Sequence, residues 1–286
     1  MEAHVWRRMA ELWTTAVPRN YARAFKPFLL CSNPKSLDRA MLPDLKNYAV
    51  GEKLDGDRVM LLADTFNGKP FVMSISRNGV MKQLDGATCH HPSLFSGTLI
   101  DGELLDTEYV AFDIVALSGL SLWQNMHDQR MRALSTATPL IRIPDIPITV
   151  KFWRPLSQLS TLEAKEGLVF VSLKEPMLPG AHPSLLKWKR QHTLDFIISP
   201  DGTVLVLDAK GGLQPFTPGK IQVAPGSVCA GVVECAMTKV GASWLATPMH
   251  LRPDKAGPNE ARVVEHTLRQ IEENVTLAEL CALASI

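Results

Sequence analysis

The sequence predicts an α+β protein of two domains, in which antiparallel sheets with helices come first and a small β-barrel follows. Its 286 residues exceed the usual size of one compact domain. Short apolar runs separated by Gly, Asn and Asp occupy residues 48–173, a pattern typical of strands. Beyond residue 192 the apolar runs become very short and turn signals divide them, as in a small antiparallel barrel. The predicted domain boundary therefore lies near residue 192.

The elements expected in the first domain begin with a helix. Apolar residues at helical spacing predict an amphipathic helix over residues 1–16, which Pro18 ends. A stretch with several charged and long side chains predicts a helix over residues 123–136, and a second helix is expected over 156–165. Apolar runs bounded by turn residues predict strands over residues 58–63, 71–75, 98–105, 109–117 and 167–173.

The elements expected in the second domain are short strands followed by two helices. Helical periodicity predicts a helix over residues 259–274. Thr276 is the predicted N-cap of a last helix, because Glu279 follows three residues later, as in a capping box. Turn signals at residues 200–202, 211–212 and 218–219 divide strands predicted over residues 194–199, 203–207, 226–236 and 243–247.

Composition excludes several classes of protein. Hydrophobic residues make up 46% and charged residues 21%, which is ordinary for a soluble protein. The net charge of +1 provides no global field, so a site for a polyanion must come from a local cluster. The chain has no stretch of about 18 apolar residues, and charges interrupt its N-terminus. Five cysteines without a Cys-x-x-Cys pair suit a reducing compartment. We expect an intracellular, soluble protein with no membrane partner.

A Lys-x-Asp-Gly element is the most informative local feature. Lys53 places a primary amine beside Asp55, on a bend that Gly56 permits, with Arg58 close behind. A solvated lysine is unprotonated only about once in a few thousand molecules at neutral pH. Burial and neighbouring cations favour the neutral, nucleophilic form, whereas an arginine would keep its proton. By itself the element also fits a surface turn with a solvated lysine, so other residues must decide.

Further elements follow Lys53, and each has an ordinary structural explanation. Asp-Gly pairs between apolar runs, such as Asp101-Gly102, occur in hairpin turns. Phe112 alone is typical of a core, and Lys187 and Lys189 alone fit the solvent face of a strand. The elements are, in chain order, Arg77-Asn78-Gly79, Asp101-Gly102-Glu103-Leu104, Phe112-Asp113, Glu166-Gly167-Leu168-Val169-Phe170, Leu186-Lys187-Trp188-Lys189 and Arg252-Pro253-Asp254-Lys255.

In this order and spacing the elements resemble the covalent nucleotidyltransferase superfamily, which holds mRNA capping guanylyltransferases and ATP- or NAD-dependent polynucleotide ligases. The resemblance extends from about Asn33 to the C-terminus and implies a nucleotidyltransferase domain over 1–192, an OB-fold over 193–275 and a helix over 276–286 that packs back on the first domain. It is greatest for the compact capping enzymes of large DNA viruses. That likeness also rests on Ser32-Asn33-Pro34, His192-Thr193-Leu194-Asp195-Phe196, Val233-Glu234-Cys235 and Ile271–Thr276.

The resemblance implies roles for residues of the first domain. Lys53 would be the nucleophile that forms a lysyl-N-GMP phosphoramidate. Arg58 and Arg77 would hold the ribose and its surroundings. Glu103, with Asp101 nearby, would hold the ribose edge or a catalytic metal ion. Glu166 would also hold the metal ion, at a position where the superfamily often has Asp.

It also implies contacts to the base and the phosphates. Phe112 would stack on guanine, and Lys151 would help to line the guanine pocket. Lys187 and Lys189 would contact the α-phosphate, and they share one strand face because side chains alternate, which turns Trp188 to the core. The second domain would reach the β- and γ-phosphates with Arg252, Asp254 and Lys255, and Asp195 ends the motif that begins at Lys187.

GTP is the expected substrate, with Mg²⁺ or Mn²⁺ as cofactor, and the metal and the lysines around Lys53 would lower the pKa of its amine. The expected partner is the 5′-diphosphate end of RNA. The two domains leave no room for an RNA triphosphatase or a cap methyltransferase, so these activities are expected on other polypeptides. A viral enzyme would act in the host cytoplasm or nucleus, or be packaged in the virion.

Two other functions stay open. An ATP-dependent polynucleotide ligase would share the motifs, although Arg252-x-Asp254-Lys255 followed by Pro258-Asn259 is typical of capping enzymes. A nonenzymatic RNA-binding subunit would keep the fold, but the intact Lys53 argues against it.

Overall fold

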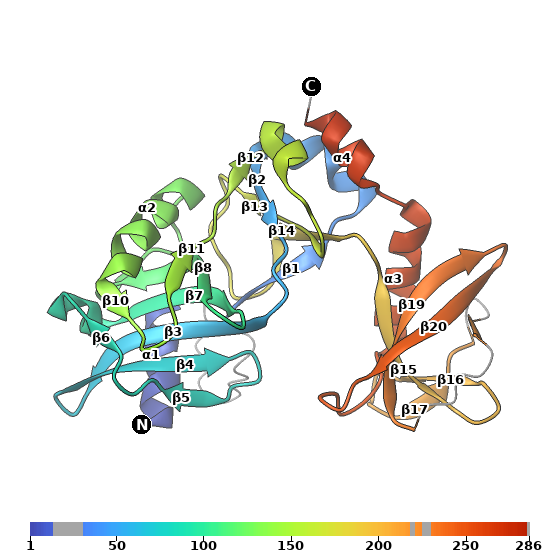
Figure 1. Ribbon diagram of the computed structural model, residues 1–286, viewed down its shortest axis with the longest axis horizontal. Helices are drawn as coiled ribbons and strands as arrows, with labels where there is room; N and C mark the ends of the chain where they lie inside the picture. The colour runs from blue at the N-terminus through green and yellow to red at the C-terminus, as the bar shows by residue number, and fades with distance from the viewer. Residues whose placement is uncertain (14–30, 218–220, 225–229, 285–286) are drawn as a thin grey trace. The chain divides into compact units, whose positions relative to one another are not determined.

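The computed structural model describes residues 1–13, 31–217, 221–224 and 230–284, and these belong to two compact units. The first unit is built from residues up to Leu37 and from Pro43–Trp188, and the second from Asp38–Leu42 and Lys189–Leu283. Figure 1 shows sheets and helices in both units. The predicted α+β fold class is confirmed.

A seven-stranded sheet forms the main body of the first unit. Its order is β11-β8-β7-β3-β4-β5, with β9 paired to β8. Neighbouring residues of β3 point to opposite faces: Met60 and Leu62 join a core with the N-terminal helix α1, while Val59 and Leu61 join a core with helix α2. Both faces are therefore covered. The elements are α1 (Glu2–Trp13), β3 (Asp57–Phe66), β4 (Lys69–Ser76), β5 (Met81–Gln83), β7 (Thr98–Leu104), β8 (Tyr109–Leu117), β9 (Leu120–Ser121), α2 (His127–Ala137) and β11 (Ile148–Val150).

A five-stranded sheet completes the first unit, in the order β1-β14-β13-β2-β12. Its strands are β1 (Ser32–Ser36), β2 (Tyr48–Glu52), β12 (Arg154–Pro155), β13 (Gly167–Ser172) and β14 (Gly180–Lys189). The chain passes between the two sheets at two places, residues 53–56 between β2 and β3 and residues 151–153 between β11 and β12. We call these the first and second crossings. Each carries a lysine singled out from the sequence.

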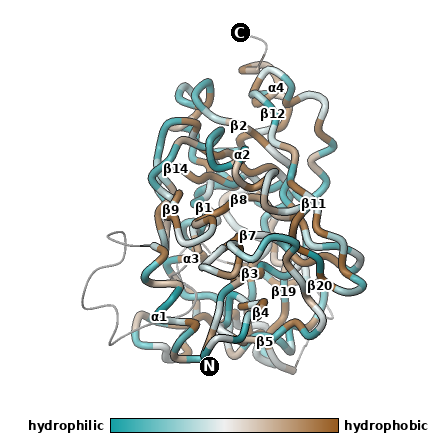
Figure 2. Tube along the Cα trace, turned by 90° about the vertical axis from the view of Figure 1, so that its left-hand side faces the viewer, coloured by the Kyte–Doolittle hydropathy of each residue, from teal (hydrophilic) through white to brown (hydrophobic). Residues whose placement is uncertain are grey.

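Short elements fill the remainder of the first unit. Strands β6 (Thr88–Cys89) and β10 (Ile141–Arg142) pair antiparallel, and the 3₁₀ helices are η4 (Arg39–Asn47), which continues from the second unit, η5 (Pro92–Ser96), η6 (Thr138–Leu140) and η7 (Leu156–Thr161). Figure 2 shows β8 as largely hydrophobic, in accord with its place inside the sheet.

The second unit is one six-stranded sheet, in the order β17-β16-β15-β19-β20-β18, with helices α3 and α4. Val264 and Leu268 of α3 pack into the core of this sheet. Arg39 ties the segment Asp38–Leu42 to the unit, because its guanidinium binds the Glu279 carboxylate and the Glu273 carbonyl. An OB-fold stays a prediction. The elements are β15 (Thr193–Ile198), β16 (Val204–Leu207), β17 (Leu213–Pro215), β18 (Ile221–Val223), β19 (Val232–Val240), β20 (Ser243–Leu251), α3 (Ala261–Glu273) and α4 (Leu277–Leu283).

Most predicted elements are present, and several predictions are wrong in detail. The helix expected over 156–165 is the shorter 3₁₀ helix η7, and the helix expected from residue 123 starts at His127, because residues 122–126 form a turn with buried Trp123. Of the strand expected over 226–236, residues 226–229 lie outside the described residues, and the observed strand begins at Val232. The end of the first predicted helix, Pro18 and the turn at 218–219 lie outside the described residues. Thr276 caps α4 as expected, with its hydroxyl accepting from the Glu279 N–H at 3.1 Å.

The alternative in which Asp101-Gly102 forms a hairpin turn is wrong. Both residues lie within β7, where the pairing with β8 is shifted by a bulge. A β-carbon at Gly102 would overlap the Tyr109 ring and approach the Val110 carbonyl at 2.7 Å. Glycine is required here by close approach, because the Tyr109 hydroxyl crosses the strand to donate to the Val59 carbonyl at 2.9 Å. None of the described helices is long and apolar enough to cross a membrane.

Gly102→Ala should lower the free energy of unfolding by about 2 kcal/mol, because the new methyl group displaces the Tyr109 ring. Urea denaturation measures this. Gly68→Asn is the matched control in the same unit: no atom lies within 4 Å of its β-carbon, and asparagine accepts the left-handed backbone there. A loss in the control as large as in Gly102→Ala would contradict the steric explanation.

Candidate active site

Lys53 follows β2 directly, and main-chain bonds fix the first crossing. Its backbone N–H donates to the Gly167 carbonyl, with N···O 2.9 Å. One residue earlier, the Glu52 carboxylate accepts from the Glu163 backbone N–H at 2.7 Å. These two hydrogen bonds therefore join the segment around Glu166 to the end of β2, directly before and at Lys53.

The half-buried Lys53 side chain donates from Nζ to the Leu54 carbonyl at 3.1 Å. The chain then bends at Gly56, as expected. A β-carbon at Gly56 would lie 2.7 Å from Cδ2 of Leu105 and 3.1 Å from Cγ of Glu103. The missing side chain thus lets the crossing pass close against the end of β7.

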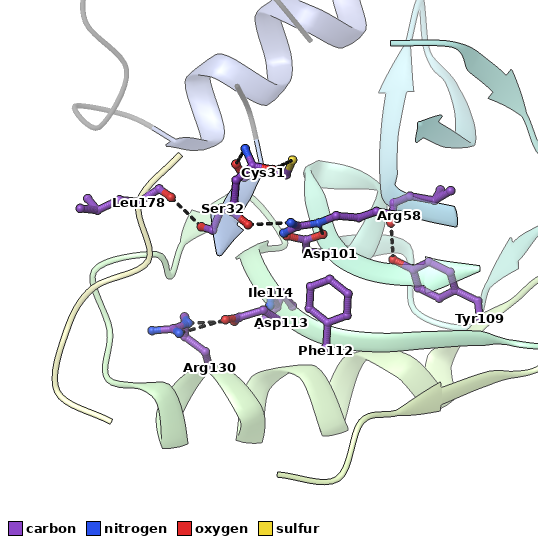
Figure 3. A network of polar contacts seen from close by, with 12 residues as sticks. Cys31, Ser32, Arg58, Asp101, Tyr109, Phe112, Asp113, Ile114, Arg130 and Leu178 are labelled. Carbon is purple, nitrogen blue, oxygen red and sulfur yellow. Dashed lines mark hydrogen bonds and ion pairs between the residues drawn. The ribbon is translucent and has the colours of Figure 1, made fainter. Parts of the chain in front are cut away.

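Arg58 forms a buried ion pair beside this crossing (Figure 3). Its Nε and Nη2 donate to the two Asp101 oxygens at 2.9 and 2.5 Å, and its Nη1 donates to the Ser32 carbonyl at 2.6 Å. Burial alone would lower the pKa of Arg58, but Asp101 holds it above the usual value. Burial raises the pKa of Asp101, and Arg58 opposes that rise. The guanidinium carbon lies 5.1 Å from the centre of the Phe112 ring.

Glu103 is the register partner of Arg58 across β3 and β7. Burial raises the pKa of the Glu103 carboxyl to about 7, although the positive charges of Arg58, Lys53 and Lys151 lower it. Asp101 adds a further small rise. The carboxyl group of Glu103 is therefore poised to gain or lose a proton near neutral pH.

Lys151 lies in the second crossing, where its backbone N–H donates to the Ala111 carbonyl at 2.7 Å. Burial lowers the pKa of its amine to about 7, against the opposing effects of Glu103 and Glu52. Its Nζ lies 5.9 Å from the centre of the Phe112 ring and 4.4 Å from the Trp153 ring. The amine thus sits above two aromatic rings.

Two predicted site residues lie at strand ends with exposed side chains. Arg77 follows β4 and lines a shallow pocket with Cys31, Arg58 and Met60. Glu166 immediately precedes β13.

The two lysines predicted to contact the α-phosphate lie on β14. Lys187 and Lys189 are half-buried and alternate with buried Leu186 and Trp188, so the expected common face is confirmed. Lys187 is the register partner of Ser36 on β1.

The residues predicted to contact the outer phosphates form an acid-rich cluster within the second unit. Arg252 donates to both Asp254 oxygens at 2.9 and 2.8 Å and to Glu234 at 2.9 Å, with Asp195 at 3.4 Å. Lys255 lies 4.0 Å from Asp195. The hydrogen bond from Arg252 lowers the pKa of Asp254 to about 2. The guanidinium is thus oriented by carboxylates.

Within the first unit the structure brings together Lys53, Arg58, Glu103, Phe112 and Lys151, which interact electrostatically or through ring contacts. In the same unit Arg77 follows β4 of the seven-stranded sheet, whereas Glu166 precedes β13 and Lys187 lies on the neighbouring strand β14 of the other sheet. Lys189, the last residue of β14, already belongs to the second unit. The second unit holds Arg252, Asp254 and Lys255, which form a separate cluster. Their roles toward a nucleotide stay predictions.

Sequence reasoning missed the layer beneath Phe112. Asp113 and Arg130 form a buried two-point ion pair at 2.8 and 2.9 Å, seen to the left of Phe112 in Figure 3. His127 packs edge-on against Trp153, with ring centres 5.5 Å apart. The spacing of Arg130 with Leu134 and Ala137 on one face of α2 was the available signal, because a buried arginine needs a buried acid.

A divalent metal ion fits the residues present. No group of three His, Cys, Asp or Glu side chains suited to a metal occurs in the part of the chain that the structure describes. Mg²⁺ needs only one or two protein carboxylates, since phosphate oxygens and water supply its other ligands. Half-buried Glu103 and exposed Glu166 carry oxygens of this kind and would be the residues to hold it.

The sequence model described as "mRNA capping enzyme, catalytic domain" matches residues 24–191. The chain belongs to the mRNA capping enzyme family. It is an enzyme, an mRNA guanylyltransferase of the covalent nucleotidyltransferase superfamily. An "mRNA-capping enzyme subunit alpha" of Candida glabrata is 24% identical over 358 residues, covering 87% of this chain and 78% of that protein. The likeness to viral enzymes stays a prediction.

Solved structures of two ligases are similar to this chain. A mycobacterial DNA ligase D complexed with ATP and MES has a TM-score of 0.46 and 18% identity, covering 79% of this chain and 94% of that one. The ATP-dependent DNA ligase of bacteriophage T7, complexed with ATP, has a TM-score of 0.43 and 16% identity, covering 65% and 80%.

Arg130→Met should destabilise the enzyme by about 3 kcal/mol or more, because it leaves the Asp113 carboxylate buried without its partner. The double variant Asp113→Leu/Arg130→Met should lose less than Arg130→Met alone. Chemical denaturation of the two single variants and the double variant measures the coupling. Additive losses would contradict a buried pair that acts as one unit.

His127 should make stability depend on pH. Burial lowers its pKa to about 4, so the unfolded chain takes up a proton between pH 6.5 and about 4 while the folded protein does not. Stability should fall as the pH falls through this window, by up to about 3 kcal/mol more in the wild type than in His127→Phe. Denaturation at stepped pH measures the difference, and parallel curves for the two proteins would contradict a neutral buried His127.

Proposed function

We propose that the enzyme transfers GMP from GTP to Lys53 and then to the 5′-diphosphate end of RNA, which forms the mRNA cap. The grouping of two half-buried lysines at the sheet crossings with a partly exposed aromatic ring and a half-buried carboxyl group carries this proposal. They are Lys53, Lys151, Phe112 and Glu103. Membership of the capping family supports it.

The groups around Phe112 suit guanine. An aromatic ring offers a face for stacking on any base. The Lys151 amine lies above the Phe112 ring and donates hydrogen bonds in its charged form. Guanine presents two acceptors, O6 and N7, on one edge, whereas adenine presents an amino donor in place of O6. A lysine donor beside the stacking ring therefore favours GTP over ATP.

In the first step the unprotonated Nζ of Lys53 attacks the α-phosphorus of GTP. The P–N bond forms as the bond to the bridging oxygen breaks, pyrophosphate leaves with that electron pair, and the amine gives a proton to solvent. Phosphoryl transfer asks a protein chiefly for positioning and for cations around the phosphate oxygens. Lys187 and Lys189 on one face of β14 provide such cations.

In the second step a terminal oxygen of the RNA 5′-diphosphate attacks the same phosphorus. The P–N bond breaks, Lys53 leaves as an amine that takes up a proton, and a 5′–5′ triphosphate linkage is formed. Opening and closing of the second unit, whose Arg252 and Lys255 would contact the β- and γ-phosphates, would separate the two steps.

Mg²⁺ or Mn²⁺ would be held by Glu103 and Glu166, and when bound it would neutralise charge on the phosphate oxygens. Residues 1–192 and 193–275 are the proposed nucleotidyltransferase and OB-fold domains, with 276–286 as a C-terminal helix.

Lys53→Ala should abolish covalent labelling, and Lys53→Arg should do so as well because a guanidinium keeps its proton. The protein is incubated with GTP or ATP labelled at the α-phosphate and with Mg²⁺, then separated on a denaturing gel. The wild type should retain label from GTP and much less from ATP. The control Lys165→Ala removes a lysine whose side chain is 83% exposed and should label normally.

Label that persists in Lys53→Ala would contradict the nucleophile. Label retained only from ATP would instead identify a ligase, and the absence of any label in the wild type would favour an RNA-binding subunit.

A further inference from the structure

Trp153 is the last residue of the second crossing and contacts both groups proposed to recognise the base. Its indole Nε1–H donates to the Phe112 carbonyl at 3.2 Å. The Lys151 ammonium lies over its ring, 4.4 Å from the centre. The ring of His127 meets it edge-on, with an angle of 88° between the planes. Three contacts from β8, the crossing itself and α2 thus fix one indole.

We propose that Trp153 is a positioning residue that sets the preference for guanine, because it holds the Lys151 amine in a fixed position relative to the Phe112 ring. This inference rests on the proposed use of GTP. Trp153 itself needs no contact with the nucleotide.

The hydrogen bond to Phe112 couples the crossing to the stacking ring. The Lys151 N–H donates to the Ala111 carbonyl at 2.7 Å, and the Trp153 indole donates to the next carbonyl along β8. The backbone of the crossing and the backbone that carries Phe112 are therefore joined at two adjacent points. Loss of the indole N–H removes the second point and leaves the Phe112 carbonyl without this donor.

The indole face favours the charged, donating form of Lys151. Burial strips water from this amine, and burial by itself favours the neutral form. A cation over an aromatic face is attracted by the ring, and the attraction is stronger when water is excluded. Trp153 therefore supports the ammonium form and also fixes its direction, which a hydrogen bond to O6 and N7 of guanine requires.

Gly51 on β2 shows how tightly the pair is held. A β-carbon there would lie 2.7 Å from Cε of Lys151 and 3.1 Å from Cε3 of Trp153. The backbone of β2 thus packs directly against both side chains. His127, which meets the indole edge-on, is 4% exposed, and its Nε2 is the one buried side-chain nitrogen or oxygen of the described residues without a hydrogen-bond partner. Its ring serves as an apolar support.

Two variants test the position without removing any proposed catalytic group. Trp153→Phe keeps a ring face and loses the N–H, whereas Gly51→Ala keeps both side chains and displaces the Lys151 stem together with the edge of the indole. Both should lower the ratio of kcat/KM for GTP to that for ATP in adduct formation, on the order of 10-fold. The loss should appear as a raised KM for GTP with kcat largely kept, because Lys53 is untouched.

The matched control is Trp244→Phe. Trp244 belongs to the core of the second unit and also carries a lysine, Lys239, 5.7 Å from its ring centre. This variant should keep the nucleotide ratio of the wild type. GTP should also change the tryptophan fluorescence of the wild type and of Trp244→Phe, and this change should be lost in Trp153→Phe.

The inference would be overturned if the ratio of kcat/KM for GTP to kcat/KM for ATP were unchanged in both Trp153→Phe and Gly51→Ala, including the case in which both values fall by the same factor. Those results would leave labelling of the wild type by GTP intact, so the proposed function would stand. If the wild type itself formed no adduct with GTP, the proposed function would fail first.

Discussion

The ion pair between Arg58 and Asp101 is the contact on which the candidate active site depends most. Arg58 lies on β3 and Asp101 on β7, and the same guanidinium binds the Ser32 carbonyl of β1 in the other sheet. One side chain therefore links the two sheets at the place where the chain crosses between them. Because Asp101 is fully buried, removal of Arg58 would leave a buried charge without compensation. The same guanidinium supports the Phe112 ring.

Burial gives the site its electrostatic character. It raises the pKa of Glu103 and lowers that of Lys151, each to about 7, so an acid and an amine stand near the midpoint of titration at neutral pH. Each group also opposes the effect of burial on the other: Lys151 lowers the pKa of Glu103, and Glu103 raises the pKa of Lys151. When a triphosphate with its metal ion binds, Glu103 or Lys151 could therefore gain or lose a proton and so change the charge of the site.

The sequence was most informative where local pattern decides structure. Strand β8 was predicted with its observed ends, because an apolar run between turn residues has few other conformations. Thr276 was found as a cap because capping is a contact between near neighbours. The shared face of Lys187 and Lys189 follows from strand alternation alone. These features need no knowledge of distant contacts.

Contacts between distant segments were out of reach. Arg130 and Asp113 are seventeen positions apart and meet only because α2 packs on β8. Trp153 stood in the sequence beside Lys151 without a role, since its partners on β2, β8 and α2 come together only when both sheets have formed. Asp101-Gly102 fitted a turn until the Tyr109 ring accounted for the glycine. The fold class and the order of the motifs were predictable, whereas the supports beneath them were not.

The central claim is that one lysine carries GMP between two substrates. Peptide mass spectrometry of the wild-type enzyme, after incubation with GTP and Mg²⁺ without RNA, tests it most directly. The account predicts an acid-labile GMP addition on the peptide that contains Lys53, and its disappearance when 5′-diphosphate RNA is added. An unmodified Lys53 peptide, or a stable addition at another side chain, would contradict it.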